Sequence, residues 1–169
     1  MRRTMCIHAR KYVGLISKHL NSISIILLSI LAAVSILVGG FNVINRALLH
    51  YPLPWVDALI RYSLIWIIFL GFPVLVKKMK LISVDVFVSR LNRRAARFFN
   101  LLSYISICIF SVVVLIQGCK ILSLPIVKLQ TVATLGISKV WIYSSIPIGF
   151  AITLIHLIVL AWDEITGRV

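Results

Sequence analysis

Acidic side chains are the scarcest functional groups in this chain. Only four of its 169 residues are Asp or Glu, namely Asp57, Asp85, Asp163 and Glu164. None of them falls in the interior of a long apolar run, although Asp57 lies near the start of one. A carrier that couples transport to an ion usually keeps a carboxylate within the membrane. The scarcity therefore argues against an ion-coupled carrier made of this chain alone.

Cysteine and histidine are also too few to build a cofactor site. The three cysteines, Cys6, Cys108 and Cys119, do not have the spacing of a metal or redox motif. His156 is the only histidine well inside an apolar run, whereas a haem-binding bundle needs histidines on facing helices. We therefore expect no cofactor, no metal and no enzymatic activity. We also expect His156 to be hydrogen-bonded within the protein.

Apolar residues make up most of what is present. They account for 61% of the chain and charged residues for only 13%, which excludes an ordinary soluble domain. A helix of about 20 apolar residues crosses the roughly 30 Å hydrocarbon core of a bilayer. We predict an all-α, polytopic membrane protein with one four-helix domain over residues 1–169. Its spans are expected at about residues 20–45, 55–76, 98–119 and 140–162.

Positive charge is distributed unevenly between the two sides of the predicted spans. Of the eighteen Lys and Arg residues, thirteen lie before the first span, between the second and third, or after the fourth. Only four lie in the two other loops. Because cytoplasmic loops carry the excess of Lys and Arg, both termini and the middle loop are predicted to be cytoplasmic. This topology also accounts for the basic charge without nucleic acid.

The middle loop has the pattern of an amphipathic helix over about residues 82–97. Its apolar face consists of Val84, Phe87, Val88, Leu91, Ala95 and Phe98. The opposite face carries Arg90, Arg93, Arg94 and Arg97. Such a helix lies in the membrane interface, with its guanidinium groups at lipid phosphates. The alternative is a solvated basic connector.

Span two contains the best candidates for a contact site. Asp57 and Arg61 are four residues apart and can form a pair on one helix face. That pair either anchors a neighbouring subunit or lipid headgroup, or it orders the start of the helix. A bulky ridge follows at helical spacing, which faces lipid, packs within the bundle or docks on a partner. The ridge consists of Trp55, Leu59, Tyr62, Trp66 and Phe69.

Span one and the segment before it give two further expectations. Residues 1–19 are expected to form a short cytoplasmic segment, as a helix lying on the membrane. Ala32, Ser35 and Gly39 form a stripe of small residues within span one, which allows another helix to approach closely.

The order of these motifs resembles the DctQ-like small membrane subunit of tripartite ATP-independent periplasmic (TRAP) transporters. The resemblance is carried by Asn42, Arg46, Pro52, Leu53, Trp55, Asp57, Arg61, Trp66, Phe69, Gly71, Ile82, Val84 and Asp85. A second patch contains Gln130, Thr131, Leu135, Gly136, Ile137, Trp141, Tyr143, Pro147 and Gly149. Asp57 stands where the family usually has the longer Glu.

The resemblance implies a non-catalytic permease subunit in the bacterial inner membrane. Such a subunit pairs with a large membrane subunit that holds the sodium and substrate sites, and a periplasmic binding protein delivers an organic acid. It implies a scaffold, or stator, against which the large subunit moves, and overall likeness suggests sialic acid as the substrate. The alternatives are an independent four-span carrier and a membrane redox enzyme. The candidate contact residues are Arg46, Trp55, Asp57, Arg61, Trp66, Phe69, Gly71 and Asp85, with Arg90, Arg93, Arg94 and Arg97 at lipid headgroups.

Overall fold

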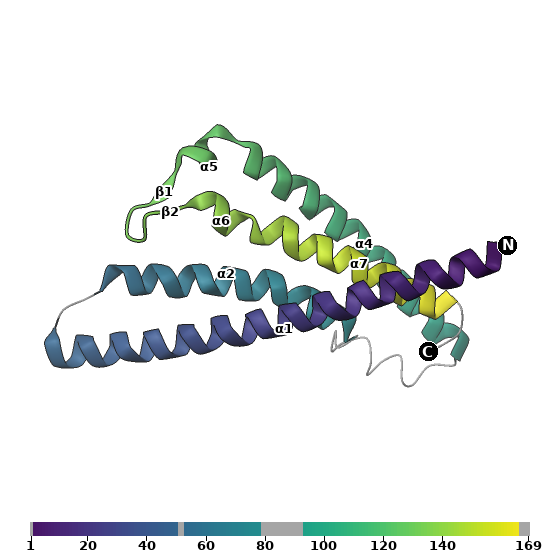
Figure 1. Cartoon of the computed structure of the whole chain (residues 1–169), viewed down its shortest axis with the longest axis horizontal. Helices are drawn as coiled ribbons and strands as arrows, with labels where there is room; N and C mark the ends of the chain where they lie inside the picture. The colour runs from purple at the N-terminus through teal and green to yellow at the C-terminus, as the bar shows by residue number, and fades with distance from the viewer. Residues whose placement is uncertain (1, 51–52, 79–92, 166–169) are drawn as a thin grey trace.

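The computed structural model describes residues 2–50, 53–78 and 93–165 (Figure 1). Its four long helices are α1 (Arg2–Leu49), α2 (Pro54–Lys77), α4 (Arg93–Ser123) and α7 (Ser145–Ile165). The short elements α5 (Pro125–Leu129), β1 (Thr131–Val132), β2 (Ile137–Ser138) and α6 (Lys139–Tyr143) connect α4 to α7.

Four stretches of these helices are long and apolar enough to cross a membrane. They are Tyr12–Leu48, Pro54–Lys77, Phe98–Ser123 and Lys139–Asp163. The predicted all-α membrane fold with four spans is therefore confirmed. Each expected span lies within one of these stretches or differs from it by a residue or two.

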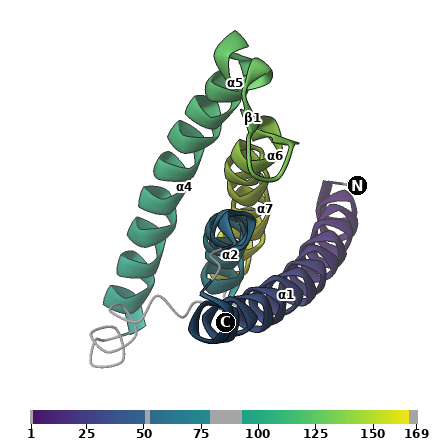
Figure 2. The same ribbon diagram turned by 90° about the vertical axis from the view of Figure 1, so that its left-hand side faces the viewer.

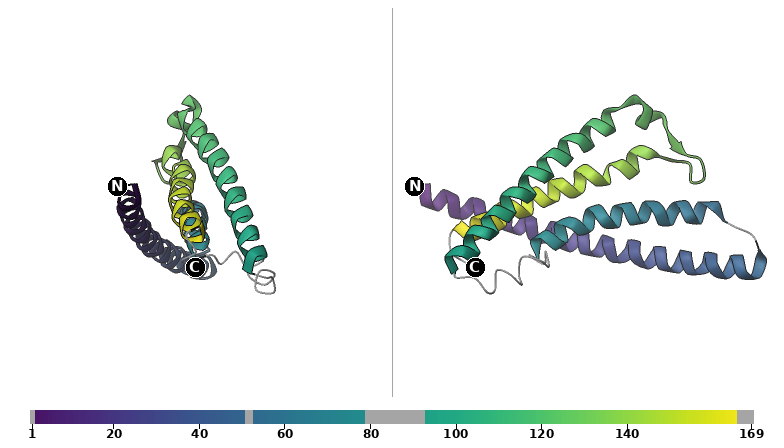
Figure 3. Two further views of the ribbon diagram at one scale, coloured as in Figure 1. Left: turned by 90° about the vertical axis from the view of Figure 1, so that its right-hand side faces the viewer. Right: turned by 180° about the vertical axis from the view of Figure 1, so that it is seen from behind.

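The long helices stand in a row rather than in a closed bundle. In the row α2 packs against α1 and α7, and α7 packs against α4. Figure 2 shows α1 and α4 on the two flanks, with α2 and α7 between them. The α1–α2 pair and the α4–α7 pair meet near both chain termini and diverge toward the loops, as the rear view in Figure 3 also shows. We call these the terminal end and the hairpin end of the molecule.

The first helix is much longer than predicted. Residues 1–19 were expected to form a separate surface segment, but α1 runs without a break from Arg2 to Leu49. Near the terminal end α1 also contacts α7. No proline interrupts this stretch, so the backbone hydrogen bonds of the helix continue through the basic segment. The segment before residue 20 is therefore not a separate helix, whereas the start of the membrane span near residue 20 stays a prediction.

The hairpin end contains the one pair of β-strands among the described residues. β1 and β2 pair antiparallel, with Thr131 opposite Ser138 and Val132 opposite Ile137. The turn between them closes through a 2.8 Å hydrogen bond from the Gly136 N–H to the Val132 carbonyl. Gly136 has φ +65°, a left-handed conformation that glycine adopts without steric cost. This short hairpin adds to the predicted helices and does not change the fold class.

Two glycines allow neighbouring helices to pack closely at the centre of the row. A Cβ atom built on Gly149 of α7 would lie 2.9 Å from the carbonyl carbon of Phe69 on α2, and closer still to its oxygen. A Cβ on Gly39 of α1 would lie 3.3 Å from the side chain of Ile60 on α2. The predicted packing stripe on span one thus has α2 as its partner. Glycines at both contacts let the helix axes come together, as is common in membrane proteins.

A small buried cluster joins three helices toward the terminal end. Val76 of α2, Tyr104 of α4 and Leu157 of α7 are each less than 10% exposed and pack together. On α1 and α4 most apolar side chains are exposed, as expected for helices that face lipid or another membrane protein. The predicted interfacial helix over residues 82–97 lies mostly outside the described residues. Only its last five residues are described, and they begin α4.

Candidate functional site

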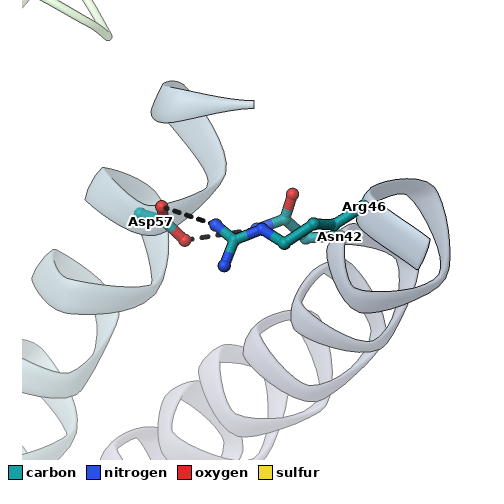
Figure 4. A network of polar contacts seen from close by, with 3 residues as sticks. All are labelled: Asn42, Arg46 and Asp57. Atoms are coloured by element: carbon teal, nitrogen blue, oxygen red, sulfur yellow. Dashed lines mark hydrogen bonds and ion pairs between the residues drawn. The ribbon is translucent and has the colours of Figure 1, made fainter. Parts of the chain in front are cut away.

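A polar cluster joins α1 and α2 at the hairpin end (Figure 4). The Asn42 side-chain amide donates to one carboxylate oxygen of Asp57 at 3.2 Å, and a guanidinium nitrogen of Arg46 lies 3.9 Å from the other oxygen. Asn42 and Arg46 are one turn apart on α1, so both reach the same side. The cluster thereby joins the end of one span to the start of the next.

Local sequence explains where these charges stand. Pro54 is the first residue of α2, a position that tolerates its missing N–H, and Asp57 falls in the first turn. Arg46 lies in the last turn of α1. A carboxylate near a helix N-terminus and a guanidinium near a C-terminus both oppose the helix dipole favourably. Each charge is therefore stabilised by its own helix as well as by its partner.

Most of the ion pair remains accessible. The side chains of Arg46 and Asp57 are 62% and 54% exposed, so water or headgroups screen their attraction and the pair contributes at most about 1 kcal/mol. Asn42, by contrast, is buried, and its side-chain oxygen has no hydrogen-bond partner among the described residues. The cluster therefore offers an exposed carboxylate and an exposed guanidinium to another group, while the buried amide oxygen of Asn42 is left unsatisfied.

The expected pair between Asp57 and Arg61 is not formed. Asp57 contacts α1 across the helix interface, while Arg61 is exposed one turn further along α2 and has no ion pair within the described part of the chain. The spacing of four residues made the pair possible, but the residues of α1 are close enough to compete for the carboxylate. The prediction of an intrahelical pair was therefore wrong, although Asp57 itself does hold a partner.

The aromatic ridge on α2 packs mainly within the molecule. Leu59, Tyr62 and Trp66 line a hollow of about 290 Å³ whose other walls come from α1, the β1–β2 turn and α6. Phe69 meets Phe150 of α7 edge to face, with ring centroids 6.2 Å apart. Trp55, at the start of α2, stays 40% exposed. The ridge was expected to face lipid, to pack within the bundle or to dock on a partner. Packing within the bundle describes most of its length.

A second polar contact lies toward the terminal end and includes His156. This imidazole is fully buried, and its Nδ1 lies 2.9 Å from the hydroxyl of Ser17, a residue 139 positions earlier in the chain. The ammonium group of Lys77 donates to the Ser17 carbonyl. The expectation that His156 is hydrogen-bonded within the protein is confirmed. Through it, α1, α2 and α7 are joined at one point.

The described residues contain no cluster that could bind a metal ion. Within residues 2–50, 53–78 and 93–165, no group of three His, Cys, Asp or Glu side chains comes close enough to hold a metal ion. The two polar contacts instead join helices. Their chemistry is that of charge pairing and hydrogen bonding between chain segments.

The remaining candidates are placed as follows. Gly71 lies on α2 with open space beside it, and Arg93, Arg94 and Arg97 fall in the first turns of α4. Asp85 and Arg90 lie outside the described residues. Sequence reasoning missed the hydrogen bonds of Ser17 with His156 and with Lys77, because nothing in the spacing of these residues relates three separate helices. It also missed that Asn42 and Arg46, four apart, face Asp57.

Comparison with known proteins gives one family match. The family model described as "Tripartite ATP-independent periplasmic transporters, DctQ component" matches residues 35–167, which is most of the chain. The matched region contains both residues of the ion pair, the Gly149 contact and His156. No curated protein matches the chain significantly.

Proposed function

The chain belongs to the DctQ family of TRAP transporters, and from that premise we propose that it is the fixed scaffold on which a sodium-coupled transport subunit moves. Members of this family are the small membrane subunits of their transporters. The chain is accordingly a multi-pass protein of the inner membrane that works with a large membrane subunit and a periplasmic binding protein.

The row of helices is the observation that best supports a scaffold. Within an apolar 18-residue segment of each span, only 6% and 11% of residues are buried in α1 and α4, against 28% in α2 and 33% in the span formed by α6 and α7. A closed four-helix bundle would bury a face of every helix. In the open row, the flanking helices α1 and α4 are instead largely uncovered. It thereby provides a wide apolar surface for a second membrane protein.

The interior contacts support a scaffold that does not itself rearrange. Gly149 brings the backbone of α7 against α2, and the Ser17–His156 contact holds α1 to α7. Closely packed helices resist continuous deformation, since any shift loses many contacts at once. A stator needs this property, because the moving subunit must push against something.

Sodium coupling and substrate choice are assigned to the partners. The carboxylates described lie near span ends, Asp57 at the start of α2 and Asp163 near the end of α7. We therefore place the sodium sites of the symporter on the large subunit. The proposed substrate is an organic acid, and sialic acid is the first compound to test on overall likeness alone. No individual residue of this chain indicates sialic acid as the substrate.

Orientation and lipid contact complete the proposal. Both described chain ends lie at the same end of the molecule (Figure 1), as an even number of spans requires. Thirteen basic residues belong to that side, so the terminal end is assigned to the cytoplasm. Arg90, Arg93, Arg94 and Arg97 are proposed to meet lipid phosphates there.

The proposed function is tested by purifying the tagged chain after co-expression with its large subunit. A mild detergent should release the two proteins in equal amounts. Vesicles should then take up substrate only with both membrane subunits, the binding protein and an inward sodium gradient. Uptake by this chain alone would support an independent carrier, and a bound haem would support a redox protein. Either result would reject the scaffold.

The polar cluster at the hairpin end gives a mutational prediction. Asp57→Ala leaves the buried side of the cluster without its acceptor and should lower co-purification of the large subunit and uptake. Because the buried Asn42 amide loses its acceptor, the cost to the chain's own stability should be about 1–3 kcal/mol. Arg46→Ala should act in the same direction. Quantitative pull-down and initial uptake rates provide the measurement.

Two further variants separate the roles of the cluster. The exchange Arg46→Asp with Asp57→Arg should restore assembly if the pair only joins α1 to α2. It should not restore assembly if the large subunit binds the carboxylate directly. Lys128→Ala, at an exposed lysine of α5, is the matched charge-removal control. Wild-type uptake by both single variants would remove the cluster from the functional site.

A further inference from the structure

An apolar groove crosses one face of the helix row. Its sides come from α1 and α4, which flank α2 and α7 in Figure 2, and its volume is about 840 Å³. That volume is within the range of about 300–1,000 Å³ typical of sites for small organic molecules. Small residues keep it open, namely Ser29 and Ala32 on α1 and Gly71 on α2. A Cβ atom added to Gly71 would meet no atom within 4 Å.

The floor of the groove is aromatic and rigid. Phe72 of α2 contacts Phe110 of α4 and Phe150 of α7, with ring centroids 6.5 Å and 5.4 Å away. Phe110 and Phe150 contact each other at 5.6 Å. These edge-to-face and tilted contacts hold the three rings together. The rings therefore support the groove and do not collapse into the space beside Gly71.

The groove offers hydrogen bonds to almost nothing. Ser29 is the one lining residue with a polar side chain among those described, and its hydroxyl donates to the Ile25 carbonyl of its own helix at 2.9 Å. A polar solute would lose its bonds to water here without replacement. The occupant is therefore a hydrocarbon.

One end of the groove carries a positive charge. Ile68, Gly71 and Leu75 line it at spacings of three and four residues, and Lys78, the residue that caps the C-terminal end of α2, follows three residues after Leu75. Lys78 is exposed at the terminal end and has no ion pair within the described residues. The ammonium group of the neighbouring Lys77 is directed elsewhere, to the Ser17 carbonyl. Lys78 is thus free to bind an anion at the mouth of the groove.

The groove together with the segment up to Lys78 matches the depth of one leaflet. From Ile68 to Lys78 the helix rises about 15 Å, which is half of the roughly 30 Å hydrocarbon core. We propose that the groove holds an acyl chain of a glycerophospholipid from the leaflet at the terminal end, with the lipid phosphate bound by Lys78. A transmembrane helix of another subunit fits less well, because it runs the full bilayer thickness and is about 10 Å wide.

Photochemical labelling of the full chain tests the site. The chain is co-expressed with its large subunit and reconstituted into vesicles of phosphatidylethanolamine and phosphatidylglycerol. The vesicles contain a trace of phosphatidylglycerol with a diazirine in one acyl chain. Illumination should label peptides that line the groove, above all those containing Phe72 and Leu75. Mass spectrometry identifies the labelled residues.

A matched pair of glycine variants makes the test specific. Gly71→Leu places its Cβ in open space and extends the side chain beside the groove, and it should nearly abolish the labelling. Gly40→Leu introduces the same side chain on α1, where an added Cβ also meets nothing within 4 Å, and should leave the labelling unchanged. Thermal unfolding of both variants checks that each remains folded. Equal labelling in the Gly71→Leu variant and the wild type would overturn the proposal.

The charge at the mouth has its own control. Lys78→Gln should reduce labelling by the anionic probe about fivefold, because a lysine at an anionic membrane surface is worth about 1 kcal/mol. Lys78→Arg and Lys128→Gln should keep the wild-type level. If groove peptides are labelled only when the large subunit is absent, a partner helix occupies the groove and the proposal fails. Uptake enters none of these readouts, so the outcome is independent of the scaffold function.

Discussion

Gly149→Ala is expected to disrupt the pairing of α2 with α7 more than any other single-methyl substitution at a glycine of this chain. The added Cβ would overlap the Phe69 carbonyl, which is backbone and cannot rotate away. Overpacking a well-packed site costs about 1–3 kcal/mol even where side chains can adjust. Here the two helices must separate. We expect strongly reduced accumulation and an early unfolding transition, measured by fluorescence-detected size-exclusion chromatography after heating.

The same substitution elsewhere provides the control for Gly149→Ala. Gly71→Ala and Gly40→Ala place their methyl groups in open space. Because alanine favours a helix over glycine by roughly 0.5–1 kcal/mol, both should be at least as stable as the wild type. Phe69→Ala should not rescue Gly149→Ala, since the obstructing atoms belong to the Phe69 backbone. A Gly149→Ala protein as stable as Gly71→Ala would show that this helix contact is looser than described.

Ser17→Ala should destabilise the chain although it removes a single hydroxyl. The variant leaves Nδ1 of the fully buried His156 without a partner, and an unsatisfied buried polar atom costs about 1–3 kcal/mol. For a chain of this size that corresponds to a fall of roughly 2–4 °C in Tm for each kcal/mol. Ser29→Ala is the matched control, because that exposed hydroxyl bonds only its own helix.

A double variant separates this contact from simple loss of packing. Replacing both partners of a buried hydrogen bond by apolar groups can be nearly neutral. Ser17→Ala combined with His156→Leu should therefore be more stable than Ser17→Ala alone. Thermal unfolding of the four proteins of this cycle gives the coupling directly. Additive effects would mean that Ser17 and His156 act separately.

The position of the spans could be predicted from the sequence because hydropathy and length alone determine it. An apolar run of twenty or more residues has few alternatives in a bilayer, since every backbone polar group must be bonded within its own segment. The N-terminal start of the first helix was harder to predict. Basic residues indicate a segment that is exposed to water. They do not end a helix, however, so the segment before residue 20 continues into α1.

Contacts between helices could not be predicted, because they depend on which faces meet. Asp57 had a possible partner four residues away, but the structure gives it Arg46 and Asn42 from the preceding helix. In the sequence, Gly149 was notable only as part of the second patch that carries the family resemblance. Its structural importance comes from the close approach of Phe69 from α2. The row order α1–α2–α7–α4 likewise has no signal in composition or periodicity.

The unbroken course of α1 has a geometric consequence for the complex. Its apolar stretch of 37 residues is about 55 Å long, nearly twice the roughly 30 Å of hydrocarbon available. Standing upright, such a rod would protrude far beyond the headgroups. Wholly immersed, it would lean about 57° from the bilayer normal, beyond the 0–40° usual for membrane helices. Its two tips would then be separated by about 45 Å along the membrane plane. A single helix at this tilt contacts widely separated points on a neighbouring protein.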